Sequence, residues 1–315
     1  MDVAGSGKSN LLEAIALIRS APQELVVPLR EGGGVVDWLF KDGFSKATPT
    51  ATLEAVVERP DQTPLRYRLG FTGVSHRLDV TDERVEDEYP QPGQPEPYFY
   101  FGYENGRPML NRAGEGNRYL KREDIDPQRS ILSQRYEPDL YPEIAFLANQ
   151  FKAIRLYRDW EFGRYAAPRL PQRADLPNDF LQDDCANLGL ILNSFGRHPA
   201  ARKRLLGHLQ RLYDGIKDPP LVCIEEPELG LHPDLIPGLA DLLLEASEAT
   251  QLVVTTHSAS LVDAFHTQPE CVVVCEKEDG STCLSRLDPS QLGVWLEQYR
   301  LGQLWTRGDL GGTRW

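Results

Sequence analysis

Residues 221–228 read Leu-Val-Cys-Ile-Glu-Glu-Pro-Glu. Four apolar residues that end in two adjacent carboxylates are typical of a buried strand with acidic side chains at its carboxyl end. Carboxylate oxygens suit Mg²⁺, and phosphoryl transfer needs a neutralising cation and an oriented water. We therefore expect Glu225 to hold Mg²⁺ through its water shell and Glu226 to orient or deprotonate the attacking water. Taken alone, the stretch could also be a core strand that ends in solvated acids.

A second motif stands near the beginning of the chain, where residues 5–9 read Gly-Ser-Gly-Lys-Ser. Glycines let backbone N–H groups curl around phosphate oxygens, as in a P-loop. Lys8 would then reach the β- and γ-phosphates, and Ser9 would offer its hydroxyl to Mg²⁺. Apolar residues recur at helical spacing directly after the loop, at Leu11, Leu12, Ile15 and Ile18. This spacing predicts a helix whose N-terminus faces the anion, and it disfavours a flexible linker.

A third motif ends in a histidine, since residues 251–258 read Gln-Leu-Val-Val-Thr-Thr-His-Ser. A helix is predicted before it, at residues 234–249, with an apolar side made of Leu235, Leu239, Leu242, Leu243 and Ala246. A strand, a helix and a strand of this length form a parallel crossover, so both strands end on the same side. Glu226 and His257 should therefore point at one site, where the histidine would hydrogen-bond a γ-phosphate or the attacking water.

These motifs resemble those of the ATP-binding-cassette (ABC) class of P-loop ATPases, and within it the soluble RecF/SMC/OLD-like branch often called AAA family ATPases. The resemblance implies an α/β fold of the P-loop NTPase type. This would be an ABC-type ATPase head with a mainly parallel core sheet, an antiparallel β subdomain and a helical subdomain. It also implies ATP and Mg²⁺ as cofactors. Lys8 and Ser9 would belong to Walker A, Glu225 and Glu226 to Walker B, and His257 would be the switch histidine.

The same resemblance implies a set of site residues. Those that would bind the nucleotide are Gly5, Ser6, Gly7, Lys8, Ser9 and Asn10, with a Q-loop glutamine for which Gln134 is the better candidate and Gln150 the alternative. Glu226 and His257 would be catalytic, and Ser9 and Glu225 would hold Mg²⁺. Residues 230–233 resemble the D-loop.

The chain departs from the family pattern in three places. Asp2 and Ala4 stand where the family has Gly and Asn, and an aspartate there would repel a triphosphate. The strand that leads into the P-loop is missing, and no Ser-Gly signature precedes Walker B, where residues 198–218 read as a basic helix. A truncated gene, a sequence recorded without some of its residues, or a degenerate paralogue would each explain this, and we expect a shortened or incomplete chain. Whether the chain hydrolyses ATP is left open by the sequence.

The domain organisation predicted from these patterns is a single ATPase head over residues 1–315. Its parts are residues 1–20 (P-loop and first helix), 50–111 (antiparallel β subdomain), 140–217 (helical region), 221–290 (core with Walker B and the switch histidine) and 291–315 (C-terminal tail). Strands are expected at residues 51–58, 65–72, 76–80 and 98–103, with turns at 61–62, at Gly73 and at 104–106. Residues 271–276 are expected as a further core strand, with 281–287 as a hairpin partner.

Composition and charge narrow the classes of function. The net charge of −13 argues against a surface broadly adapted to nucleic acid. Residues 155–165 nevertheless interleave cations with aromatic rings, which fits either DNA contact or a half-buried strand edge. The chain has no apolar run that could cross a bilayer and no signal segment, and its five cysteines are odd in number. We therefore predict a cytoplasmic protein with reduced thiols and no membrane association.

Two functions from different classes fit the sequence. The first is an ATP-binding and ATP-hydrolysing head that acts as a nucleotide-driven switch. Such a head would pair with a second copy as a homodimer, associate with DNA and work with a separate Toprim-like nuclease in anti-phage defence or DNA repair. The alternative is a degenerate or truncated head that serves as a non-catalytic scaffold or nucleotide sensor. The motor subunit of a membrane transporter is disfavoured, because the Glu-Glu-Pro-Glu motif fits the soluble branch better.

Overall fold

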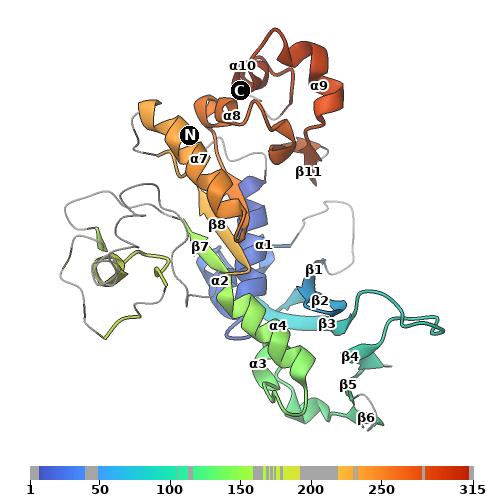
Figure 1. Ribbon diagram of the computed structural model, residues 1–315. Helices are drawn as coiled ribbons and strands as arrows, with labels where there is room; N and C mark the ends of the chain where they lie inside the picture. The colour runs from blue at the N-terminus through green and yellow to red at the C-terminus, as the bar shows by residue number, and fades with distance from the viewer. Residues whose placement is uncertain are drawn as a thin grey trace. The chain divides into compact units, whose positions relative to one another are not determined.

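The computed structural model describes most of the chain, namely residues 7–39, 49–104, 106–112, 116–158, 166–167, 170, 173, 175–177, 180–191, 219–229, 231, 233–278 and 281–311. It divides into two compact units (Figure 1). The first comprises residues 1–10 and 154–315, and the second comprises residues 11–153. Several sequence predictions fall outside the described residues: those on Asp2, Ala4, Gly5, Ser6, Gly230 and His232, and the basic helix at 198–218.

An antiparallel sheet forms the largest part of the second unit. Its six strands follow one another in sequence order: β1 (Thr50–Arg59), β2 (Gln62–Val74), β3 (Arg77–Asp87), β4 (Phe99–Glu104), β5 (Arg107–Arg112) and β6 (Gly116–Tyr119). Every neighbouring pair is antiparallel. Four of these strands are expected from the sequence, and the hairpin turn after β4 is present; β6 is not expected.

The turn between β2 and β3 differs from the prediction. Gly73 lies inside β2, paired with Leu78, where an added Cβ would stand 3.1 Å from Val35 Cγ1. The chain reverses instead at Ser75 and His76, whose φ angles are 49° and 63°. Two successive positive φ angles are those of a type I′ hairpin turn. The predicted turn at Gly73 is therefore wrong, because that glycine serves a close approach rather than a reversal.

Helices complete the second unit. Besides most of α1 (Lys8–Ser20), they include α2 (Val26–Glu31), the short α3 (Ile131–Gln134) and α4 (Pro142–Ala153), with 3-10 turns at Val35–Asp37 and Arg122–Asp124. Helix α4 buries one face, made of Ile144, Ala145, Leu147, Ala148 and Phe151. The Phe151 ring meets Tyr67 of β2 edge-on, with ring centroids 5.3 Å apart. Tyr67 is fully buried, so this contact belongs to the core of the unit.

Helix α1 (Lys8–Ser20) begins at the lysine of the P-loop motif, as the sequence predicts. Its buried residues are Leu12, Ala16 and Leu17, whereas Leu11 is 36% exposed. The predicted helix is confirmed, but its predicted apolar face is displaced by part of a turn, because Leu11 belongs to the exposed side.

A three-stranded parallel sheet lies in the first unit. Its order is β7 (Arg155–Tyr157), β8 (Leu221–Glu225) and β9 (Gln251–Thr255), and both neighbouring pairs are parallel. Helix α7 (Ile236–Ser247) connects β8 to β9 after a 3-10 turn at Pro233–Leu235. The predicted crossover between the two motif strands is thus confirmed. β7 is the start of the cation- and aromatic-rich stretch at 155–165, of which residues 159–165 lie outside the described part.

Further elements of the first unit follow β9. They are α8 (Ala259–Ala264), a 3-10 turn at Pro269–Cys271, β10 (Val273–Glu278), β11 (Ser281–Arg286), α9 (Pro289–Leu296) and α10 (Leu301–Thr306). The predicted hairpin of β10 and β11 is confirmed. Among the described residues this hairpin is a separate two-stranded sheet, so β10 does not extend the parallel sheet as expected. No helix in the described part of the chain is long and apolar enough to cross a membrane.

Candidate functional site

The carboxyl ends of β8 and β9 bring the acidic and histidine motifs together. Glu225 and Thr255 form the last pair of the parallel ladder. Just beyond it, His257 Nε2 lies 3.8 Å from Glu226 Oε1. That separation exceeds a hydrogen bond, and the two side chains are 51% and 29% exposed. A carboxylate and an imidazole therefore face a common, solvent-accessible point at the end of the sheet.

Glu226 has an unusual backbone conformation. Its φ of 44° lies in the left-handed region, which costs a residue with a Cβ about 1–2 kcal/mol. Hydrogen bonds hold this conformation: Glu226 N–H donates to Thr255 O at 2.8 Å, and Leu229 N–H donates to Glu226 O at 3.0 Å. Strained residues of this kind concentrate at functional sites. The strained residue and the bond from Leu229 form a turn directly after β8.

The P-loop residues that the structure describes lie at the same site. Ser9 Oγ donates to Glu225 Oε1 at 3.3 Å, so the two oxygens predicted to hold Mg²⁺ are neighbours. Burial lowers the pKa of the Lys8 ammonium, and the nearby Cys275 and Glu226 oppose that shift. Gly7 has a φ of 88°, which favours glycine, and Asn10 is exposed. Gly5 and Ser6 lie outside the described residues.

Gln134 belongs to the second unit and supports a loop there. Its side chain donates to Asp126 O at 3.1 Å and to Arg129 O at 2.8 Å. Its Oε1 accepts from Asp126 N–H at 2.8 Å. These bonds fasten the segment that precedes α3. The role of Gln134, or of the alternative Gln150 on α4, as a Q-loop residue stays a prediction.

Two residues of the site are missed by the sequence predictions. Thr256 Oγ1 donates a hydrogen bond to Glu228 Oε1, which connects the segment after β8 to the segment after β9. Glu228 is the third acid of the Glu-Glu-Pro-Glu motif, and Thr256 is the second threonine of Thr-Thr-His. Both residues belong to the quoted motifs, but they are 28 positions apart in the sequence, and no local periodicity indicates that their side chains are hydrogen-bonded.

The donor set fits a magnesium nucleotide. Mg²⁺ in phosphate sites needs only one or two protein oxygens, because phosphate and water oxygens complete its shell. Ser9 and Glu225 provide such oxygens, and Lys8 places a cation in the first turn of α1, where the helix dipole also favours an anion. Within the described residues there is no group of three or more His, Cys, Asp and Glu that would make a self-sufficient metal centre.

Residues 5–263 match the family model described as "AAA domain, putative AbiEii toxin, Type IV TA system". The match covers more than half of the chain. The chain belongs to this AAA domain family. Its fold is therefore the α/β fold of P-loop NTPases, and the resemblance to OLD-like AAA ATPases drawn from the motifs is confirmed.

The AAA domain is also similar to a curated relative, the Old nuclease of Escherichia phage P2. The two are 38% identical over 66 residues, which are 21% of this chain and 11% of that protein. The match thus spans about a tenth of the relative's length, and it supports the family without extending to the whole relative.

Proposed function

We propose that this AAA domain binds ATP with Mg²⁺ and hydrolyses it, with Glu226 as the general base. The observation that carries the proposal is the cluster at the ends of β8 and β9: Ser9 lies 3.3 Å from Glu225, and His257 lies 3.8 Å from Glu226. The cluster combines metal-binding oxygens, a base and a hydrogen-bonding imidazole, as phosphoryl transfer to water requires.

Each side chain has a distinct task in the proposed reaction. Bound Mg²⁺ would neutralise charge on the phosphates. Lys8 binds phosphate oxygens through its ammonium group, and the Ser9 hydroxyl and Glu225 carboxylate are the metal-binding oxygens. Glu226 orients a water molecule and accepts its proton, while His257 hydrogen-bonds the water or a phosphate oxygen. Glu226 follows the metal-binding Glu225 in a strained turn, and its carboxylate lies 3.8 Å from His257, which fits the role of base.

We also propose the wider role that the partial similarity to a nuclease supports. ATP binding would join two copies of the head in a homodimer, and hydrolysis would release them. This switch would act with DNA and a separate Toprim-like nuclease in the cytoplasm, in anti-phage defence or DNA repair. The division of the chain into the five parts given above belongs to the same proposal.

The first test is nucleotide binding and turnover by purified protein, with and without double-stranded DNA. Glu226→Gln is expected to lower kcat by about 10²–10⁴-fold while ATP binding persists, because the amide cannot accept the proton. Lys8→Ala is expected to weaken ATP binding itself. Glu248→Gln is the matched control, since it makes the same change at an exposed position after α7, where neither quantity should change.

The outcomes separate the two functions. Turnover that depends on Glu226 and Lys8 supports the ATPase. Binding of ATP without turnover in the wild type would favour the alternative of a nucleotide sensor, and the absence of both would favour a scaffold.

A further inference from the structure

We propose that Glu228 and Thr256 form a latch that holds His257 beside Glu226, which makes both of them positioning residues. The Glu228–Thr256 latch is the hydrogen bond that Thr256 Oγ1 donates to Glu228 Oε1. The proposal rests on the proposed function, because it assigns the latch to the same site. Neither residue is among the groups expected to touch nucleotide or metal.

The latch adds a side-chain bond between two loops that are also connected through the backbone bond from Glu226 N–H to Thr255 O. Glu228 lies three residues beyond β8, in a turn closed by two backbone bonds of 3.0 Å, from Leu229 N–H to Glu226 O and from Leu231 N–H to Glu228 O. Thr256 directly follows β9. One side-chain bond therefore connects the turn that carries Glu226 to the segment that carries His257.

The hydrogen bonds of the Thr256 side chain also restrain the backbone on both sides of His257. Its Oγ1 accepts a hydrogen bond from Ser258 N–H at 2.9 Å while donating to Glu228. The hydroxyl is therefore oriented by two partners, one on each loop, and residues 256 and 258 are fixed around the histidine between them. Hydrogen bonds to an ionised carboxylate are among the stronger ones in proteins.

The segment after His257 is anchored to the hydrophobic core. Ser258 caps α8 by accepting from Leu261 N–H at 3.2 Å. Leu261 is 1% exposed and packs with Ile236, Ala240 and Leu243 of α7. His257 is thus held between a core-anchored helix on one side and the latch on the other.

Burial makes the latch costly to break. Glu228 Oε2 is buried and has no hydrogen-bond partner among the described residues. Without the Thr256 hydroxyl, neither oxygen of this carboxylate would have a partner in the described part of the chain, and the turn would have to rearrange to hydrate it. The His257 side chain is 51% exposed, so much of its surface faces solvent rather than packed neighbours. A displacement of about 1 Å at a catalytic group can lower a rate about 10²-fold.

The decisive experiment measures whether His257 still senses Glu226 when the latch is removed. The ring nitrogen and proton NMR signals of His257 are assigned among the six histidines by His257→Gln. The change that Glu226→Gln makes in these signals is then measured in full-length wild type, Thr256→Val and Thr256→Ser. Thr250→Val is the matched control: Thr250 Oγ1 donates to Pro219 O at the opposite end of β9.

The latch predicts that Glu226→Gln shifts the His257 signals in wild type, in Thr256→Ser and in Thr250→Val, but no longer in Thr256→Val. Serine keeps the hydroxyl and valine keeps only the shape, so the contrast isolates the hydrogen bond. An undiminished effect in Thr256→Val, or no effect in wild type, overturns the proposal. Should Thr256→Val fail to fold, Glu228→Leu breaks the same bond from the other side, while Glu228→Gln keeps an acceptor oxygen and should behave as wild type.

Kinetics give a second readout that separates this proposal from the proposed function. In an active wild type, Thr256→Val should lower kcat by about tenfold or more with an unchanged KM, and Thr256→Ser should restore kcat. Equal kcat values for Thr256→Val and wild type would overturn the latch. An inactive wild type would instead contradict the ATPase, and the NMR comparison would still decide on the latch.

Discussion

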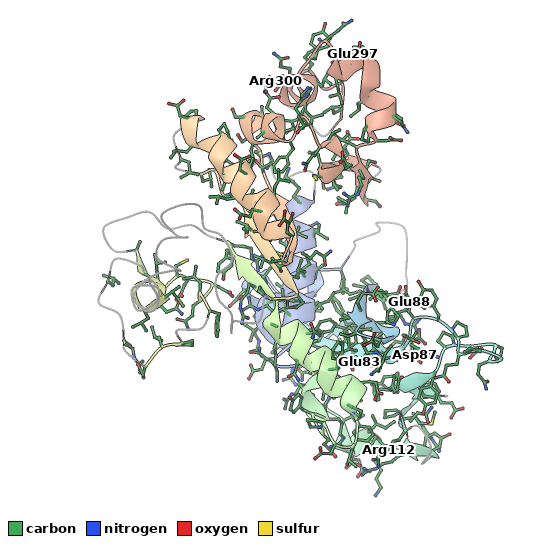
Figure 2. All side chains as sticks on the ribbon, viewed as in Figure 1. Glu83, Asp87, Glu88, Arg112, Glu297 and Arg300 are labelled. Carbon is green, nitrogen blue, oxygen red and sulfur yellow. The ribbon has the colours of Figure 1, made fainter. Side chains whose placement is uncertain are left out.

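Glu83, labelled in Figure 2, is a fully buried carboxylate on β3 of the second unit. Three donors surround it: the hydroxyls of Tyr67 and Ser130 and the backbone N–H of Ile131, at the start of α3. Burial raises the pKa of Glu83 from 4.5 to about 7, and these hydrogen bonds, which favour the charged form, keep it from rising further. The folded protein therefore holds this proton more tightly than the unfolded chain does.

This shift predicts a pH-dependent stability. The contribution of Glu83 to the free energy of unfolding is greatest below about pH 4.5, falls as pH rises to about 7, and is constant above it. The total loss is about 3 kcal/mol. Glu83→Gln should remove this slope, because the amide does not titrate. Urea unfolding at several pH values measures it, and Glu58→Gln, an exposed position on β1, is the control that should keep the slope. Equal slopes in Glu83→Gln and wild type would contradict the assignment.

At the scale of the element, helix α7 shows where hydrophobic periodicity stops being informative. Leu235 directly precedes the helix, and leucines recur within it at 239, 242, 243 and 244, so the sequence allows more than one apolar face. The structure buries Ile236, Ala240 and Leu243, whereas Leu235 is 56% exposed and Ala246 is exposed. The predicted helix is right and its predicted face is partly wrong, because packing against Leu261 of α8 decides between the candidate faces.

Leu243, which is buried, and Leu235, which is exposed, provide a matched pair of variants. Leu243→Ala should lower the free energy of unfolding by about 2–5 kcal/mol, because it leaves a cavity beside Ile236 and Ala240. Leu235→Ala makes the same chemical change at an exposed position and should alter stability by less than about 0.5 kcal/mol. Chemical denaturation of both variants measures the difference. Similar losses for the two would show that the face predicted from the sequence, rather than the observed one, is buried.

The whole molecule carries a net charge of −13, which bears on the proposed pairing of two heads. Two copies of the same sign repel one another, and salt screens that repulsion. We expect Glu226→Gln to bind ATP without consuming it, and Mg²⁺ with ATP to shift this variant to twice the monomer mass.

Light scattering after size exclusion measures that mass, and the dimer fraction should rise with ionic strength. Lys8→Ala should remain monomeric under the same conditions. A monomer at every ionic strength with ATP bound would contradict the homodimer.

Local sequence patterns predicted the elements that carry the motifs, and they are the source of the site chemistry that we propose. Two of these motifs involve only residues close together in the sequence, so local patterns predict them. One is the apolar run that ends in Glu225 and Glu226, and the other is the Gly-Ser-Gly-Lys-Ser loop before an amphipathic helix. The parallel crossover follows from the length of the connecting helix, which is also local information.

Which side chains meet across the sequence follows from the packing of the elements. Two hydrogen bonds, from Thr256 to Glu228 and from Ser130 to Glu83, join residues far apart in the chain. Two leucines of equal hydrophobicity differ in burial, since Leu243 is buried and Leu235 is exposed. Such contacts depend on which surfaces pack together, and no local periodicity encodes that. The residues proposed to act at the site could therefore be named from the sequence, but the hydrogen bond proposed to hold His257 beside Glu226 could not.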